Sequence, residues 1–570
     1  MNRLLTCVLL MIMPFFIKAQ TPGRYHVLIT EIMADPAPMV GLPNNEWIEI
    51  KNVSSSPINV QGWRISDASG QSGPMPFYLL QPDSMLIICT NSAVSALSAY
   101  GAVISVTSFP SLDNDGDLVY LITENNLVMH AIDYTVDWYQ NELKKEGGWT
   151  LEMIDPGNPC AGSMNWKSST DSKGGTPGSI NSVNGIVSDL ASPQLKKAYS
   201  PDKYTIILEF DEPIDSSSAA PISNYRVDNG LTVIEAILLG PLFNKVQLTT
   251  RQEMETGKIY LVTVTNIRDC NGLMISGQNE IRVGITEEAM ALDLVINEIL
   301  FNPRSNANDF VEYYNRSQKI IDGSELYIAN RNNANAISSA RQLTPVPFLI
   351  FPGDYVVVTS DLQNLQLNYL VKYPGAVLII SSLPSFPDNN GFVLLLNKQG
   401  EIIDEVNYDR NWHLKLLDND EGVSLERINP EAPSQKSDNW QSAASSAGFG
   451  TPTYINSQFR QSGLTDLSIT VTPKIFSPDN DGFDDFTLIN FILNEPGYIA
   501  NVTIFDGVGR PVKYLVRNGT LAQQGSWKWD GLNEDGQLLP IGNYIILTEI
   551  FNLQGSTKKY KNVVVLAKRM

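Results

Sequence analysis

Four closely spaced aspartates near the C-terminus are the strongest candidate metal ligands in the sequence. Asp479, Asp481, Asp484 and Asp485 lie in PDNDGFDD, around a glycine that favours a turn. Carboxylates on such a turn suit Ca²⁺, which takes about 6–8 oxygen ligands. The segment is not an EF-hand, because Leu488 stands where the bidentate acid belongs. Asx residues also form turns through their own backbone, so a calcium site and a plain turn both stay open.

A similar acidic run occurs in the first third of the chain. Asp113, Asp115 and Asp117 fall within five residues of one another. They could also surround a calcium ion, or they could form an ordinary hairpin turn. The corresponding segment 387–391 of the internal repeat described below has lost half of these carboxylates, which favours the turn.

Two pairs of glutamates recur in the sequence and could carry acid–base chemistry. Glu31 and Glu49 return as Glu298 and Glu312. Two acids that face a cleft can act as general acid and general base in hydrolysis. All four flank apolar strand residues, however, where a carboxylate can instead accept hydrogen bonds from loop N–H groups. The second interpretation is favoured, and no catalytic residue is assigned.

Two tryptophans are candidate ligand contacts. Trp138 and Trp412 each stand in a turn-rich stretch after a predicted strand. An exposed tryptophan in such a place can stack on a sugar ring, whereas packing at the edge of the core is the structural alternative.

The charge balance restricts the classes of partner. The 570 residues include 40 Lys plus Arg and 61 Asp plus Glu, for a formal net charge of −21. This excess disfavours nucleic acid and anionic lipid, and favours cationic partners such as divalent metal ions. There are only 3 histidines, and the sequence lacks HExxH, GxSxG, a Walker loop and paired CxxC motifs. The commonest catalytic signatures are therefore absent, although a carboxylate-only enzyme would lack them as well.

The N-terminus predicts export. Residues 1–20 combine Arg3, an apolar run over 4–17 and the small residue Ala19, as secretory signals do. The run is shorter than the ~20 residues of a membrane span, and no later segment is apolar enough, so no transmembrane segment is expected in the mature chain. The remaining cysteines, Cys89, Cys160 and Cys270, are odd in number and far apart, so the sequence predicts no disulfide framework.

A long internal repeat organises the chain. Two copies, at about 25–182 and 293–457, share several motifs in the same order. The matching segments are VLITEIMADP and LVINEILFNP, NEWIEIKN and NDFVEYYN, GAVISVTSFPSL and GAVLIISSLPSF, WTLEMIDP and VSLERINP, and GTPGSINS and GTPTYINS. The offset changes as loops lengthen and shorten, so a whole domain has been duplicated.

Short apolar blocks bounded by Pro, Asn and Gly predict strands rather than helices. Blocks near 28–29, 47–50, 85–88 and 119–122 read as strands of a sandwich. One helix per copy is expected, over 92–100 in the first copy and over 362–373 in the second. The strand pattern and the division of the chain predict an all-β string of four β-sandwich domains, which the resemblances described next imply to be Ig-like β-sandwich domains.

The two copies resemble the lamin tail domain, an Ig-like β-sandwich of nuclear lamins and of many secreted bacterial proteins. The opening ITEIMADP, the following NEWIEIKN, the later Asn-Trp and the closing GTPGSIN carry the resemblance. The second copy departs from it at Asn302, in place of Asp35, and at Phe310, in place of Trp47. The resemblance implies interaction modules.

Two single domains complete the chain. Residues 187–286, with FDEPID and RDCNG, resemble bacterial Ig-like modules of S-layer and adhesin-like proteins, which are usually spacers. Residues 464–570, with FSPDNDGFDD, WDG and PIGNY, resemble the C-terminal Ig-like domain of hook-capping proteins and the domains that direct cargo through type IX secretion. The second resemblance implies an export and anchoring role in a Gram-negative bacterium.

The sequence therefore predicts an exported, non-catalytic protein that is secreted or displayed on the cell surface. Its expected partners are an extracellular glycan or protein and, through the last domain, the export machinery. A cell-envelope structural role is a second expectation. The alternative is an accessory subunit, or a carboxylate-based secreted hydrolase, acting on an extracellular polymer.

Overall fold

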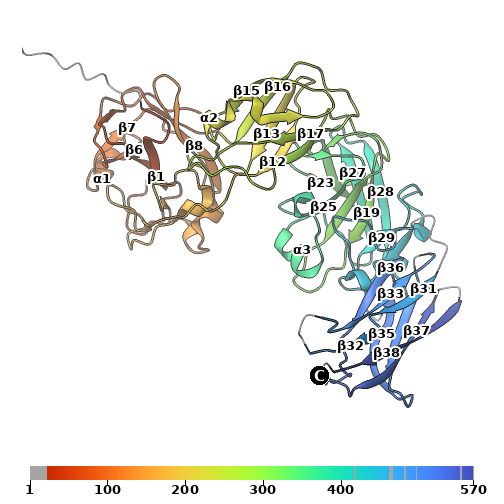
Figure 1. Cartoon of the computed structure of the whole chain (residues 1–570). Coiled ribbons are helices and arrows are strands. Elements are labelled where there is room, and N and C mark those ends of the chain that lie inside the picture. Colours follow the sequence, from red (N-terminus) through yellow and green to blue (C-terminus); the bar gives the residue numbers. More distant parts are fainter. Residues whose placement is uncertain are drawn as a thin grey trace, which may run out of the picture. The chain divides into compact units, whose positions relative to one another are not determined.

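The computed structural model describes residues 22–568 except 416, 418, 461–466, 480–482, 496 and 553–554. The predicted signal segment 1–20 lies outside the described residues. The chain forms two compact units, one ending at Arg282 without Met254–Ile259, and one made of that short segment and the residues from Val283 onward. Both units consist of β-sandwiches whose strands pair mostly antiparallel, with parallel pairs at β6-β7, β25-β26 and β32-β38, and Figure 1 shows strands throughout with only short helices. The predicted all-β, Ig-like class is confirmed.

The first copy of the repeat packs a six-stranded sheet, in the order β11-β10-β1-β2-β6-β7, against the three-stranded sheet β4-β8-β9. A small sheet, β3-β5, completes it. Its elements are β1 (Val27–Met33), β2 (Trp47–Asn52), β3 (Ile58–Asn59), β4 (Arg64–Ser66), β5 (Leu79–Leu80), β6 (Met85–Cys89), α1 (Val94–Leu97), β7 (Val103–Ser105), β8 (Gly116–Ile122), β9 (Val128–Thr135), η1 (Val136–Tyr139), η2 (Lys144–Glu146), β10 (Leu151–Met153), η3 (Gly162–Asn165) and β11 (Trp166–Ser168).

The rest of the first unit is a smaller sandwich of a four-stranded sheet, β12-β13-β16-β15, and a three-stranded sheet, β14-β17-β18. Its elements are β12 (Leu195–Tyr199), β13 (Thr205–Phe210), α2 (Ser216–Ala219), η4 (Ile222–Asn224), β14 (Tyr225–Val227), β15 (Val233–Leu239), β16 (Lys245–Thr250), β17 (Tyr260–Val264) and β18 (Glu280–Val283).

The second copy repeats the strand order of the first, with β30-β29-β19-β20-β25-β26 opposite β23-β22-β27-β28 and the small pair β21-β24. Its elements are β19 (Leu294–Leu300), β20 (Phe310–Asn315), β21 (Ile321–Asp322), η5 (Gly323–Glu325), β22 (Leu326–Arg331), β23 (Ile337–Gln342), β24 (Leu349–Ile350), β25 (Tyr355–Thr359), α3 (Leu362–Asn368), η6 (Pro374–Ala376), β26 (Val377–Ile379), β27 (Asn390–Asn397), β28 (Ile402–Asp409), η7 (Arg410–Trp412), β29 (Leu425–Arg427), η8 (Ser437–Asn439), β30 (Trp440–Ser442) and η9 (Ser445–Ala447).

The C-terminal sandwich pairs β31-β33-β36 with β32-β38-β37-β34-β35 around its own apolar core. Its elements are β31 (Ser468–Thr472), β32 (Ile475–Phe476), β33 (Thr487–Ile492), β34 (Ile499–Phe505), β35 (Pro511–Thr520), β36 (Gln524–Trp529), β37 (Gly542–Phe551) and β38 (Thr557–Leu566). In the part of the chain that the structure describes, no helix is long and apolar enough to cross a membrane.

The two expected helices are present but shorter than predicted. Each covers the face of the six-stranded sheet that lies away from the main core, through Leu97 of α1 and Leu365 of α3. In α3 the Asp361 side chain caps the first turn by accepting from the Asn364 amide. The central strand of each sheet is consequently buried along its whole length, including its polar residues.

A β-bulge interrupts the pairing of β1 with β2 and recurs between β19 and β20. A bulge takes a backbone group out of the ladder, which must then find another partner. In the first copy the Ile29 amide donates to Nδ1 of His130 at 3.0 Å, and burial lowers the pKa of this histidine to about 4. The ring is therefore neutral at physiological pH.

The second copy satisfies the same amide with a carboxylate. Ile296 donates to Oδ2 of Asp404 at 2.8 Å, and Asp404 is 3.2 Å from the guanidinium of Arg427 in a fully buried ion pair. By strand register Asp404 corresponds to His130, and by sequence Arg427 corresponds to Met153. The neutral residues His130 and Met153 of the first copy are thus replaced by the ion pair Asp404–Arg427 in the second copy.

The described residues contain a single disulfide, which the prediction of no disulfide framework did not foresee. Cys160 and Cys270 are joined by a disulfide with a Cα–Cα distance of 6.3 Å, and Cys89 is free and buried. The odd number of cysteines after residue 20 concealed this pair, whose members are 110 residues apart and link the two sandwiches of the first unit.

The ion pair of the second copy makes a testable prediction. Arg427→Met leaves the buried Asp404 charge without its partner, and we expect a loss of about 3–5 kcal/mol in the stability of this domain. The double variant D404H/R427M restores the neutral pair of the first copy and should recover at least part of that loss. Urea unfolding of the full chain, followed by hydrogen exchange in β19 and β29, measures both. Equal instability of the two variants would contradict the proposed exchange of one pair for the other.

Candidate functional site

Three buried glutamates lie side by side across the six-stranded sheet of each copy. Glu31 of β1 is directly opposite Glu49 of β2 on one side and Glu152 of β10 on the other. These three residues, the first glutamate row, are fully buried. Buried like charges in direct register destabilise a sheet unless other groups compensate them.

The segment 175–183, here called the first closing segment, supplies that compensation. The Thr176 amide donates to Glu31 at 2.8 Å and the Gly178 amide donates to Glu49 at 2.6 Å. The Thr176 hydroxyl donates to Glu152 at 2.9 Å. Backbone N–H groups from a segment more than a hundred residues away thus bind Glu31 and Glu49.

The end of the first closing segment completes the set of contacts. The Ser182 hydroxyl and the Val183 amide both donate to Glu152, at 2.8 and 3.1 Å. The Asn181 amide group donates to the carbonyls of Thr30, in the bulge, and of Met153. This explains why the repeated motif ends in Ile-Asn-Ser.

The second copy repeats the arrangement contact for contact. The row Glu298, Glu312 and Glu426 is fully buried and receives donors from the second closing segment, 450–458. The Thr451 amide donates to Glu298 at 2.9 Å and the Thr453 amide donates to Glu312 at 2.6 Å. Further donors to Glu426 are the hydroxyls of Thr451 and Ser457 and the amide of Gln458.

One position of the closing segment has an unusual backbone. Gly178 has φ +73°, and Thr453, its counterpart, has φ 75°. At Gly178 a Cβ would meet the Tyr100 carbonyl at 2.3 Å, so glycine suits the first copy. In the second copy the Thr453 hydroxyl instead accepts from the Tyr373 amide at 3.0 Å. The positive φ is kept in both because this amide donates to a buried carboxylate.

Burial and mutual repulsion raise the pKa values of Glu31, Glu49, Glu298, Glu312 and Glu426. Burial, and then the neighbouring carboxylates, hold the pKa values of Glu31 and Glu312 well above the usual range. Burial raises the pKa of Glu49 to about 7 and that of Glu298 to about 8, and it also raises the pKa of Glu426. All five carboxylates are inaccessible to a polymer substrate. The structural interpretation of the glutamate pairs is therefore the one that the contacts support.

Each copy also has a cavity at the same end of its sandwich. In the first copy a cavity of ≈ 950 Å³ is lined by Ile58, Asn59, Trp63, Glu124 and Asn125, together with His26 and the serines 54–56. In the second copy a cavity of ≈ 340 Å³ has equivalent walls. Ile321, Asp322, Leu326, Lys398 and Gln399 occupy the corresponding positions, and residues 286–289 replace the N-terminal segment.

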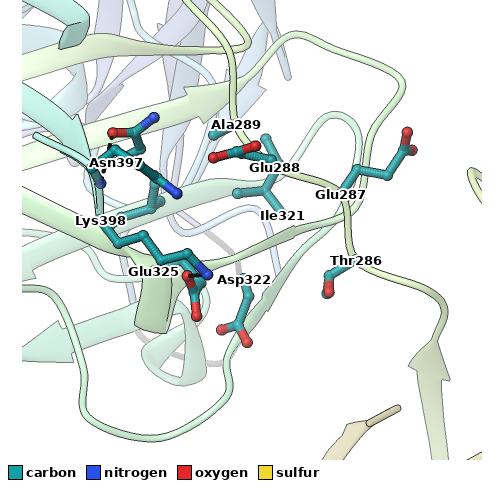
Figure 2. Close-up of a pocket in the computed structure, with 11 residues that line it drawn as sticks. Thr286, Glu287, Glu288, Ala289, Ile321, Asp322, Glu325, Asn397 and Lys398 are labelled. Atoms are coloured by element: carbon teal, nitrogen blue, oxygen red, sulfur yellow. Dashed lines mark hydrogen bonds and ion pairs between the residues drawn. The ribbon is translucent and has the colours of Figure 1, made fainter. Parts of the chain in front are cut away.

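The linings of the two cavities differ in charge. The second has four carboxylates, from Glu287, Glu288, Asp322 and Glu325, against the single ammonium of Lys398. Figure 2 shows the Lys398 ammonium beside the Glu325 carboxylate, with which it forms an ion pair, and Asp322 near both. The lining of the first is largely neutral, with serine and asparagine groups beside Glu124. The second cavity therefore favours a cationic group.

The first predicted acidic run, 113–117, contains a turn in the structure. Asp113 and Asp117 are joined by a hydrogen bond from the Asp113 amide to the Asp117 carboxylate at 3.4 Å, and the Asp115 carbonyl accepts from Val136. Asp113, Asp115 and Asp117 do not bring three carboxylate oxygens within 4.8 Å of one another. A calcium ion in this loop stays a prediction.

The C-terminal acidic loop is described only in part. Asp481 lies outside the described residues. Asp484 adopts φ 50°, and its carbonyl accepts from the Ser477 amide, while the Asp479 amide donates to the Ser477 carbonyl. Asp485 lies just before β33. The predicted calcium site of Asp479, Asp484 and Asp485 remains a prediction as well.

The two candidate tryptophans occupy equivalent positions and pack against the core. Trp138 in η1 lies 6.2 Å from Trp166, and Trp412 in η7 stacks on Trp440 at 6.2 Å, both measured between ring centroids. Both are half-buried. Each covers the tryptophan of the repeated Asn-Trp motif, and a role in sugar binding stays a prediction.

Comparison with known families assigns part of the first copy. Residues 20–136 match the Lamin Tail Domain family. The match ends within η1, before the first closing segment. The second copy shares the strand order and the glutamate row of the first copy, as described above. No curated protein matches the chain.

Solved structures give only distant similarities. The surface layer protein SbsC, domains 1–6, is 11% identical over 67% of this chain and 55% of that one, with a TM-score of 0.16. PorZ, a surface component of the type-IX secretion system of Porphyromonas gingivalis, is 12% identical over 80% of this chain and 56% of that one, also at 0.16. A tetra-tandem repeat of a large adhesion protein is 10% identical over 95% and 100%, at 0.12. The chain spans about half the length of the S-layer structures that it matches.

Sequence reasoning found two members of each glutamate row and missed the third. Glu152 and Glu426 stand in the repeated segments WTLEMIDP and VSLERINP, so their recurrence was a usable signal. The two cavities were missed because their walls come from segments that are far apart in the sequence. Also missed was a cluster of three acids in the first unit, Asp189, Glu212 and Asp269.

The glutamate rows predict that stability falls as the pH rises. The pKa of Glu49 is about 7 and that of Glu298 about 8 in the folded chain, against 4.5 for an unshifted glutamate. Between these values the folded state holds protons that the unfolded state has released, so the stability present at low pH is lost as the pH rises through 7 and 8. We expect the free energy of unfolding to fall between about pH 6.5 and 8.5, by up to about 1.4 kcal/mol per pH unit for each glutamate.

Thermal unfolding of the full chain across this interval measures the effect. His130 and His413, whose pKa values burial lowers from 6.5 to about 4, are neutral in the folded state throughout it, so they oppose the trend only at its lower end, where unfolded histidine still binds protons. Glu298→Gln removes one titrating group while keeping an acceptor for Thr451. It should flatten the pH dependence of hydrogen exchange in the second closing segment. A stability that is constant or rises over the interval would refute the prediction.

Proposed function

We propose that this chain is an exported, non-catalytic protein that presents two lamin tail domains as binding modules, either on the surface of a Gram-negative cell or as a secreted protein. Its ligand is an extracellular glycan or protein. In this proposal the central Ig-like domain is a spacer, and the C-terminal domain mediates export and anchoring. The second copy, 293–457, acts as the second lamin tail domain.

One observation carries the binding role. Both copies keep a cavity at the same end of the sandwich, built from equivalent positions, while the side chains in its walls change from neutral to acidic. A rigid sandwich that retains a hollow between loops but varies its lining has the properties of a scaffold for recognition. The two modules would then bind chemically different groups, and the acidic one would bind a cationic group.

Two features support export. The predicted secretory signal covers residues 1–20, and the Cys160–Cys270 disulfide belongs in an oxidising compartment. The negative net charge of −21 also argues against nucleic acid as a partner. These features fit a protein that functions outside the cytoplasm.

The alternative, a carboxylate-based hydrolase or its accessory subunit, has less support. The recurring acids are buried and bound to the backbone of the closing segments rather than open to a substrate. No contact of the described residues favours acid–base chemistry at these rows. The non-catalytic role is therefore the better proposal.

The acidic cavity can be tested with cationic peptides. We expect short lysine- and arginine-containing peptides to bind the full chain, and Glu288→Gln to weaken that binding. The loss of one charge-assisted contact, about 1.5 kcal/mol, corresponds to roughly tenfold in Kd. Glu288 is exposed and its side chain supports no other element, which makes it suitable for substitution.

Glu124→Gln in the cavity of the first copy is the matched control, and it should leave peptide binding unchanged. A glycan array probed with the same three proteins examines the neutral cavity, where Glu124→Gln and not Glu288→Gln should alter the signal. If neither probe binds, or if both variants behave as the original chain does, the cavities are not binding sites and the proposal fails.

The role of the last domain is tested on intact cells. We expect added protease to cleave the full chain but not a chain that ends before residue 464, because without its export domain the truncated protein stays inside the outer membrane. Immunoblots of protease-treated cells, with a periplasmic protein as control for membrane integrity, report the difference. Equal exposure of both chains would show that the domain is dispensable for export.

A further inference from the structure

Three carboxylates converge in the first unit, at the disulfide that links its two sandwiches. Asp189 follows the first closing segment, Glu212 lies in the turn after β13, and Asp269 lies in the loop after β17. One ligand oxygen from each lies within 4.8 Å of the other two. The three residues come from separate segments, so only the folded chain brings them together.

Only one of the two carboxylate oxygens of Asp269 accepts hydrogen bonds from the described residues. Its side chain is 1% exposed, and Oδ1 accepts from the amides of Asn271 and Leu273 at 2.8 and 2.9 Å. The other oxygen, Oδ2, is buried and has no hydrogen-bond partner among the described residues. A buried, ionisable oxygen without a partner is costly and calls for a ligand that the protein itself does not supply.

The Glu212 carboxylate is also without a partner. No residue that the structure describes donates a hydrogen bond to it or forms an ion pair with it, and the side chain is partly buried. Burial, and then the carboxylates of Asp269, Asp189 and Asp211, raise its pKa to about 8. The nearby Arg268 does not neutralise the group, because its guanidinium donates to the Gly272 carbonyl.

The surrounding contacts hold this cluster in place. The Asn271 side chain donates to Oδ2 of Asp189 at 2.8 Å and to Oδ1 of Asn158 at 2.5 Å. Cys270, between Asp269 and Asn271, is disulfide-bonded to Cys160. The cluster therefore keeps three acids close together by a covalent link and by side-chain hydrogen bonds, although nothing in the described residues offsets their charge.

We propose that Asp189, Glu212 and Asp269 form a Ca²⁺ site that fixes the junction of the first lamin tail domain with the Ig-like domain. The donors are all oxygens, as a hard cation requires. Ligands on opposite sides of Ca²⁺ are about 4.6–5.2 Å apart, because each Ca–O distance is about 2.3–2.6 Å, so three oxygens within 4.8 Å fit one coordination shell. Water and the Asn158 side chain can complete the shell.

Hydrogen exchange of the full chain, first stripped with EDTA and then titrated with CaCl₂, tests this site locally. We expect peptides that contain 186–191, 211–215 and 268–273 to exchange about tenfold more slowly when the Ca²⁺ concentration is about ten times the Kd. Glu212→Gln and Asp189→Asn should each abolish this protection. Without Ca²⁺, Glu212→Gln should leave exchange unchanged near pH 7 and slow it above about pH 8, where the ionised Glu212 carboxylate repels its neighbours.

The control is Glu253→Gln, which changes an exposed acid paired with Lys203 in the same sandwich and should retain full Ca²⁺ protection. Calorimetry should show one fewer Ca²⁺ bound to Glu212→Gln than to the original chain, whether or not the loops at 113–117 and 479–485 also bind Ca²⁺. Absence of protection in the original chain at millimolar Ca²⁺, or equal protection in Glu212→Gln, would overturn the proposal.

Discussion

The constraint on which each repeated domain depends is the burial of three adjacent carboxylates in the middle of its main sheet. Six such groups, in two rows, have no access to water, and a buried carboxylate without donors is strongly destabilising. Backbone amides and hydroxyls of the closing segments, at matching positions in the two copies, donate hydrogen bonds to these carboxylates. Much of the sequence that the two copies share follows from this constraint: the glutamates, the bulge beside them, the Gly-Thr-Pro turn and the final Asn-Ser.

Where the copies differ, the same backbone requirement is met by different chemistry. The amide of the bulge is bound by neutral His130 in one copy and by Asp404, paired with Arg427, in the other. The neutral histidine needs only one further hydrogen-bond acceptor. The buried aspartate needs a cation, and Arg427, which stands where the first copy has Met153, provides it. Duplication has preserved the geometry of the sheet while allowing paired changes around it, and the cavities at the loop end have diverged in the same manner.

Much of the fold was predictable, because local sequence patterns determine it. The repeat, the strand blocks and the two short helices can be read from apolar periodicity and turn residues, and Glu31, Glu49, Glu298 and Glu312 attract attention because they recur. The functional geometry was less accessible. Glu152 and Glu426 become the third members of their rows only through strand pairing across more than a hundred residues. Asp189, Glu212 and Asp269 meet only after two sandwiches have folded and docked, and Cys160 finds Cys270 for the same reason.

The position of the closing segments at the ends of their domains has a consequence for biogenesis. In a chain that emerges from a membrane channel N-terminus first, Glu31 and Glu49 arrive long before residues 175–183, which cover them. Until those residues have crossed, the carboxylates must stay hydrated, and the sheet cannot close over them. In such a chain, each repeated domain would stay incompletely folded during passage because of its own sequence order. Its final collapse is coupled to the passage of its last nine residues.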